Sequence, residues 1–201
     1  MAISTCIIFA ALSAVQKTPI LDIPTDGWVD LFFGPVSDPQ SINGRAKLSG
    51  LQDLQKKMLP VGVTEVRIWE GFGLTYLEGY RFRYEGKRWR GWWIQPLRQD
   101  RPAWKATSYL LEFKPPKQGW DEFWKTMVAN DLPTLPDFES LPGDKATILD
   151  GVAYVVEYAV TGKYRTYMYS NPQSQRGNWP ELQKLRTIVK EIHNSFRNQT
   201  N

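Results

Sequence analysis

Residues Tyr80–Ile94 read YRFRYEGKRWRGWWI, and this stretch decides the fold of the chain. Aromatic and arginine side chains alternate on both sides of the dipeptide Glu85-Gly86. Alternation with a period of two is typical of a β-strand, and a glycine-containing dipeptide between two such runs is typical of a hairpin turn. The stretch therefore predicts a β-hairpin with one aromatic face and one cationic face.

The residue types also predict the register of this hairpin. A three-residue turn would mix aromatic and arginine side chains on each face, whereas a two-residue turn at Glu85-Gly86 keeps them apart. We therefore expect the two-residue turn. The predicted cross-strand pairs are Tyr84 with Lys87, Arg83 with Arg88, Phe82 with Trp89, and Arg81 with Arg90.

The cationic side of the hairpin is the candidate binding site. Like charges directly opposite each other destabilise a strand pair, so another group must compensate them. One explanation is an anionic partner held by guanidinium groups and an indole ring. The other is neutralisation by nearby carboxylates, or solvation of an outward face. We call this set the arginine face, and its candidate ligand-binding residues are Arg81, Arg83, Arg88, Arg90 and Trp92.

The remaining sequence predicts more strands and a few helices around this hairpin. The fold class is α+β, an antiparallel sheet of about six strands covered on one face by two or three helices. The predicted strands are 61–70, 74–84, 87–97, 104–113, 152–160 and 164–170, and the predicted helices are 45–59, 119–130 and one that follows Asn178. The turn at Thr161-Gly162 fits either two or three residues.

The C-terminal helix has the clearest pattern. Its apolar residues recur at spacings of three and four, which places them on one stripe that must pack on the sheet. Asn178 is the expected N-cap, with Glu181 three residues later. His193 lies beside the stripe and is interpreted as a residue on the flank of the helix. The stripe consists of Leu182, Leu185, Val189, Ile192 and Phe196.

The N-terminus predicts export. Residues 1–16 carry no ionisable side chain except Cys6, and an apolar run is followed by small residues. We expect a signal peptide at 1–14, because the run is shorter than the ~18 apolar residues of a membrane span. A buried N-terminal strand is the alternative. An extended arm is expected at 15–44 and a single α+β domain at 45–201. The mature chain would contain no cysteine, no disulfide and no membrane span.

Composition and motifs exclude several functions. The net charge of +4, without a run of lysines and arginines, does not indicate nucleic-acid binding. The chain has one histidine, one cysteine and no G-x-S-x-G motif, so neither a metal cluster nor a catalytic triad is predicted. Gly71-Phe-Gly73 lacks the third glycine of a dinucleotide fingerprint. We therefore expect no cofactor, no metal and no catalytic residue.

Two stretches resemble parts of uncharacterised bacterial exported proteins. One resembles their C-terminal portion and the other resembles their middle, and together they cover about a third of the chain. The resemblance implies bacterial export and carries no catalytic residue. The stretches are Asp150–Tyr154 with Tyr164–Pro172 and Trp179–Leu182, and Glu65–Gly73.

These observations predict an exported, non-enzymatic binding or accessory domain. Its arginine face would bind an acidic envelope component, either a glycan or a protein. The alternative is a carboxylate-dependent hydrolase that acts on a glycan or a peptide, because the chain contains 21 Asp and Glu residues that spacing alone does not pair.

Overall fold

A computed structural model describes residues 18–199 apart from 74, 98–109, 147 and 149–150. In this part of the chain seven strands form one sheet in the order β1-β7-β6-β2-β3-β4-β5. All neighbouring strands are antiparallel except β1 and β7, which are parallel. The strands are β1 (Ile20–Asp22), β2 (Thr64–Gly71), β3 (Glu78–Glu85), β4 (Arg88–Ile94), β5 (Leu110–Glu112), β6 (Ala153–Val160) and β7 (Lys163–Ser170).

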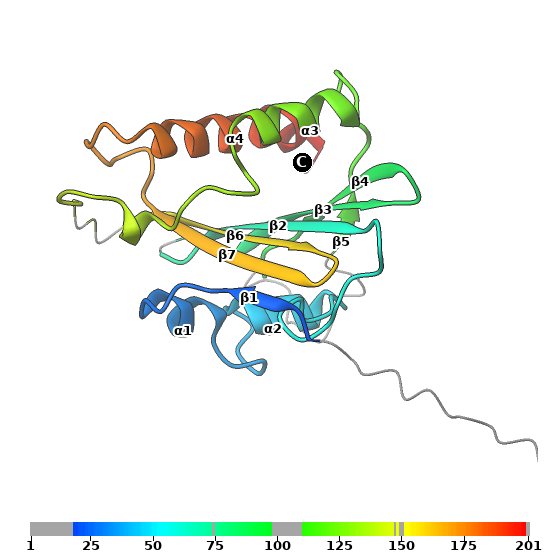
Figure 1. Ribbon diagram of the computed structural model, residues 1–201, viewed down its shortest axis with the longest axis horizontal. Coiled ribbons are helices and arrows are strands. Elements are labelled where there is room, and N and C mark those ends of the chain that lie inside the picture. Colours follow the sequence, from blue (N-terminus) through cyan, green and yellow to red (C-terminus); the bar gives the residue numbers. More distant parts are fainter. Residues whose placement is uncertain (1–17, 74, 98–109, 147, 149–150, 200–201) are drawn as a thin grey trace, which may run out of the picture.

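Helices cover both faces of this sheet (Figure 1). On one face lie α3 (Trp120–Ala129) and α4 (Pro180–Phe196), and on the other lie α1 (Trp28–Phe33) and α2 (Ile42–Leu48). The α+β class and the C-terminal helix are confirmed, but the expectation of helices on one face only was wrong. The described residues also include two short 3₁₀ helices, Phe138–Ser140 and Arg197–Gln199.

The central strands carry side chains that pack into a core on each face of the sheet. In β2, every residue from Glu65 to Gly71 is buried. Val66 and Ile68 pack into the larger core beneath α3 and α4, together with apolar residues of α4. Trp69 packs on the opposite face against Trp28 and other residues of the α1 and α2 layer.

The hairpin of β3 and β4 has the predicted faces but a different register. The two-residue turn is Gly86-Lys87 and not Glu85-Gly86, because Glu85 pairs with Arg88. Both turn residues have positive φ angles, 59° and 63°, as a type I′ turn requires. The register moves by two positions, so every side chain keeps its predicted face. The observed pairs are Tyr84 with Trp89, Arg83 with Arg90, and Arg81 with Trp92.

Several predicted boundaries differ from the structure. Residues 18–44 are not an extended arm, because they contain β1, α1 and the start of α2. The predicted helix 45–59 is limited to α2, and Leu54 and Leu59 in the segment after it instead fill a small core against β6 and β7. Asn178 does not cap α4, whose N-cap is Trp179 and whose first residue is Pro180.

The structure decides one alternative that the sequence left open, and some predictions concern residues outside the described ranges. Val160 pairs with Lys163, so the turn at Thr161-Gly162 has two residues. Of the predicted strand 104–113, only β5 is described, and 104–109 and the predicted signal peptide 1–14 lie outside the described residues. None of the helices in the described ranges has the length and apolarity that crossing a membrane requires.

The stripe of α4 should carry a large share of the stability. Leu185 is fully buried in the core between α4 and the sheet. We expect Leu185→Ala to lower the free energy of unfolding by about 2–5 kcal/mol, because it removes buried apolar contacts and leaves a cavity. Val128→Ala on α3, whose side chain is exposed, should change it by less than about 0.5 kcal/mol. Urea denaturation of both variants measures this, and equal losses would contradict the packing described here.

Candidate functional site

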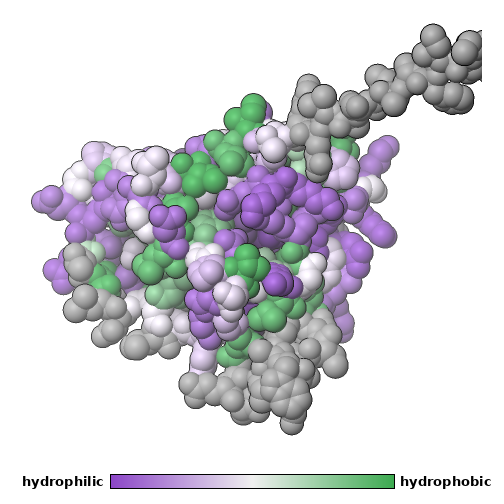
Figure 2. Space-filling model, turned by 90° about the horizontal axis from the view of Figure 1, so that it is seen from below, coloured by the Kyte–Doolittle hydropathy of each residue, from purple (hydrophilic) through white to green (hydrophobic). Residues whose placement is uncertain are grey.

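The structure brings the whole arginine face together on the α1 and α2 side of the sheet. Side chains of β3 and β4 alternate between faces, so the aromatic residues Tyr80, Phe82 and Trp89 enter the core beneath α3 and α4. The arginine face lines a hollow of about 500 Å³ that Glu85 and Gly86 also border. Seen from this side, the molecular surface carries hydrophilic patches between hydrophobic ones (Figure 2).

A single buried carboxylate organises the inner part of this face. Glu65 of β2 is fully buried and accepts hydrogen bonds from three arginines. Arg67 donates from Nε and Nη2 to Oε1, at 2.9 and 2.8 Å. Arg81 donates from Nε to Oε1 and from Nη2 to Oε2, at 3.0 and 2.9 Å. Arg83 donates from Nη1 to Oε2 at 2.7 Å.

These guanidinium groups determine the charge state of Glu65. Burial alone would raise the pKa of this carboxyl, but the charge of Arg67 and the charge and hydrogen bonds of Arg81, together with the hydrogen bond from Arg83, lower its pKa to about 2. A carboxyl whose pKa is lower in the folded state stabilises the fold above its unfolded pKa, and this contribution is lost as the pH falls from about 4.5 to about 2. Glu65 is therefore an ionised anchor at neutral pH.

Exposed carboxylates neutralise the outer part of the face. Arg83 also pairs with Glu85, and Arg90 forms two hydrogen bonds to Glu112 of β5, at 2.7 and 2.6 Å. Arg83 and Arg90 are directly opposite each other in the hairpin. Their repulsion is thus offset by carboxylates on β2, β3 and β5, which is one of the two explanations that the sequence left open.

Trp92 lies between two guanidinium groups. The Cζ atom of Arg81, which is opposite in the register, is 4.7 Å from the centroid of the indole ring, and that of Arg90 is 4.9 Å from it. Cation–π attraction at these distances favours the positions of both guanidinium groups beside the indole ring.

Arg88 differs from the other arginines of the face. It is exposed, it lines the same hollow, and no carboxylate of the described residues lies within ion-pair distance of it, although its charge helps to lower the pKa of Glu112. Arg81 and Arg90 each donate from Nε and Nη2 to a carboxylate, and their Nη1 atoms make no hydrogen bond within the described residues. The arginine face therefore presents unused donors on three neighbouring guanidinium groups.

The buried ionic network continues beneath α2. Glu157 of β6 is opposite Arg67 in the register, with 3.8 Å between its Oε2 and Arg67 Nη1. It accepts hydrogen bonds from Trp69 Nε1 at 2.7 Å and from the hydroxyl of Tyr164 at 3.1 Å. Burial raises the pKa of Glu157. Its oxygens are engaged by neighbouring side chains, so we assign it a structural role.

Sequence reasoning missed a second polar cluster, on the opposite face of the sheet. His193 Nε2 of α4 lies 2.8 Å from Glu70 Oε2 of β2, and the hydroxyl of Tyr154 donates to Glu70 Oε1 at 3.1 Å. Glu70 is directly opposite Glu78 across β2 and β3, and burial raises the pKa of Glu78. Trp93 Nε1 donates to Glu78 at 2.8 Å.

The sequence contained a signal for this cluster. Alternation along β2 places Glu70 on the same face as Val66 and Ile68, where a carboxylate needs a partner. The only histidine of the chain lies one residue from the buried stripe of α4, and it supplies that partner.

The described residues show no metal cluster, and comparison with known proteins gives no family. In the described ranges, no group of three or more His, Cys, Asp or Glu residues is arranged to hold a metal ion. The sequence matches no known family model, and no curated protein matches it significantly.

Glu65 and Glu85 both pair with Arg83, and they make a matched test of the network. We expect Glu65→Ala to lower the free energy of unfolding by about 3–5 kcal/mol, because it removes the buried carboxylate that Arg67, Arg81 and Arg83 share. Glu85→Ala removes an exposed partner, so it should lower the free energy of unfolding far less than Glu65→Ala does.

Urea denaturation at pH 7 gives both values. Equal small losses for the two variants would mean that Glu65 is not an anchor of the network.

Proposed function

We propose that this protein is an exported, non-enzymatic binding or accessory domain whose arginine face binds an acidic envelope component, a glycan or a protein. The observation that carries the proposal is Arg88, an exposed guanidinium group without an ion-pair partner among the described residues, beside guanidinium groups that are already held in place. Guanidinium groups recognise carboxylates and phosphates through paired donors.

The ion pairs of the face support binding because they orient its arginines in advance. Arg81 is held by a buried carboxylate and by the indole ring of Trp92, so little side-chain entropy is lost when a ligand binds. The pairs of Arg83 with Glu85 and of Arg90 with Glu112 involve exposed carboxylates. Exposed pairs are weak, so a polyanion with several carboxylates can displace them.

The carboxylate-dependent hydrolase has less support. A cavity of about 410 Å³ beneath α2 is lined by two acidic residues, Asp53 and Glu157. Glu157 is occupied by Trp69 and Tyr164, and Asp53 pairs with Lys56 and accepts a hydrogen bond from the backbone of Gln55. The carboxylate of Glu157 is thus engaged by neighbouring side chains, and that of Asp53 lies in an exposed ion pair.

Binding to two model polyanions tests the proposal. We expect wild-type protein to bind polygalacturonate or poly-L-glutamate in isothermal titration calorimetry at low salt, and to bind more weakly at physiological ionic strength, where the Debye length is about 8 Å. Arg88→Ser should weaken binding about tenfold, because it removes a charge-assisted hydrogen-bond donor.

Arg176→Ser is the matched control. Arg176 is exposed and follows β7, whereas the arginine face is near the opposite ends of the strands. Equal affinity of wild type and Arg88→Ser, or equal loss in both variants, would show that the arginine face is not the binding site.

A further inference from the structure

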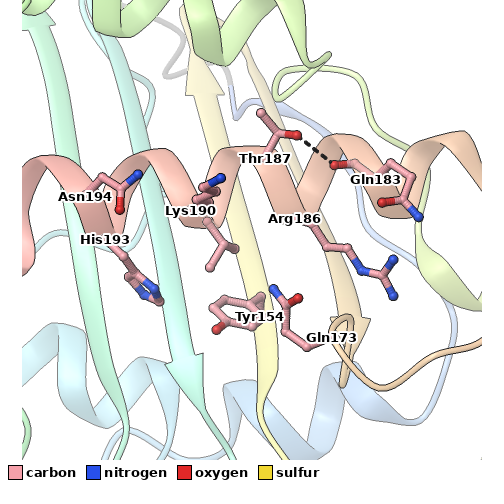
Figure 3. Close-up of a pocket in the computed structure, with 9 residues that line it drawn as sticks. Tyr154, Gln173, Gln183, Arg186, Thr187, Lys190, His193 and Asn194 are labelled. Carbon is pink, nitrogen blue, oxygen red and sulfur yellow. Dashed lines mark hydrogen bonds between the residues drawn. The ribbon is translucent and has the colours of Figure 1, made fainter.

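A second hollow lies between α4 and the end of the sheet, on the face opposite the arginine face. Its volume is about 530 Å³, large enough for a small organic molecule. In Figure 3, His193 and Arg186 extend from α4 toward the sheet, and Tyr154 and Gln173 lie opposite them. The lining residues are Tyr154, Gln173, Gln183, Arg186, Thr187, Val189, Lys190, His193 and Asn194.

The charged groups that line this hollow are basic. Arg186, Lys190 and His193 are spaced by four and three residues, so they share one face of α4. The other polar lining groups are amides and hydroxyls, and none of the described lining residues is acidic. A hollow with this lining favours a negatively charged ligand.

Arg186 and His193 are held in place by the protein, whereas Lys190 is not. Arg186 donates from Nε to the carbonyl oxygen of Pro172 at 2.7 Å and from Nη2 to that of Gln175 at 2.9 Å. Its Nη1 atom makes no hydrogen bond within the described residues. Lys190 is exposed and has no ion pair within the described residues.

His193 is oriented by the buried carboxylate of Glu70. Nε2 of His193 lies 2.8 Å from Oε2 of Glu70, within hydrogen-bond distance. This fixes the ring and leaves Nδ1 as its second polar atom. The charge of Glu70 is shared with Arg197, whose Nη2 lies 3.7 Å from Oε1, and with the hydroxyl of Tyr154.

A basic residue in the last turn of a helix also complements the helix dipole, and His193 is in that turn. That role does not account for Arg186, which lies two turns earlier and faces the same hollow. We infer that the hollow is a binding site for a small organic anion, whose phosphate or carboxylate group is held by Arg186 and Lys190 and lies beside the imidazole of His193.

The single histidine allows a direct test. The imidazole of His193 gives one set of signals in ¹H–¹³C correlation spectra, because the chain has no other histidine. We expect inorganic phosphate or succinate, titrated at constant pH and ionic strength, to shift these signals with a saturable dependence. The anion with the higher affinity identifies the preferred group, and sodium chloride should give no saturable shift.

Lys190→Ala should weaken this binding roughly tenfold, because it removes a charged donor. Lys184→Ala is the matched control on the same helix, since Lys184 pairs with Asp131 and does not line the hollow. An absence of saturable shifts with both anions, or equal affinities in wild type and Lys190→Ala, would overturn the inference. The arginine face takes no part in this experiment, so its outcome is separate from that of the proposed function.

Discussion

The arrangement of the arginine face depends on the ionised carboxylate of Glu65. This group is buried in the middle of the sheet, where an unpaired charge would be prohibitively costly. Three guanidinium groups from β2 and β3 compensate it, and burial in turn strengthens their attraction. The same contacts fix Arg81 and Arg83, so a single buried anion sets the positions of two residues that line the proposed binding surface.

Side-chain alternation along the strands gives the sheet two different faces. Toward α3 and α4, the strands present aromatic and aliphatic residues that form the larger core. Toward α1 and α2, apolar clusters alternate with the ionic network of Glu65, Arg67 and Glu157. The hairpin carries this second face to its turn, where it presents Arg88 without an ion-pair partner in the described part of the chain. The buried ionic network and the exposed cations thus lie on the same face of the sheet.

The sequence predicted local features better than long-range ones. Alternation in Tyr80–Ile94 gave the two faces of the hairpin correctly, because side-chain direction depends only on the period of the strand. It placed the turn one residue too early, since a lysine with positive φ is uncommon and leaves no mark in composition. The cover on the second face was missed because Glu65 and Arg67 look solvent-exposed in a sequence, and only their pairing across strands allows their burial.

In the candidate site too, the sequence predicted the local features but not the long-range contacts. The members of the arginine face could be named from residue type, but their partners Glu65 and Glu112 lie on other strands. The contact between Glu70 and His193 joins positions 123 residues apart, and no local pattern connects them.

The pH dependence of stability in wild type and in Glu65→Gln tests the central claim most directly. The variant is nearly isosteric but cannot ionise, so the difference in unfolding free energy between the two proteins reports the charge of Glu65. Since the folded pKa is about 2 and the ordinary value is 4.5, this difference should be constant above about pH 5 and shrink by about 3 kcal/mol as the pH falls to 2. A difference that does not change with pH, or that grows on acidification, would contradict the account.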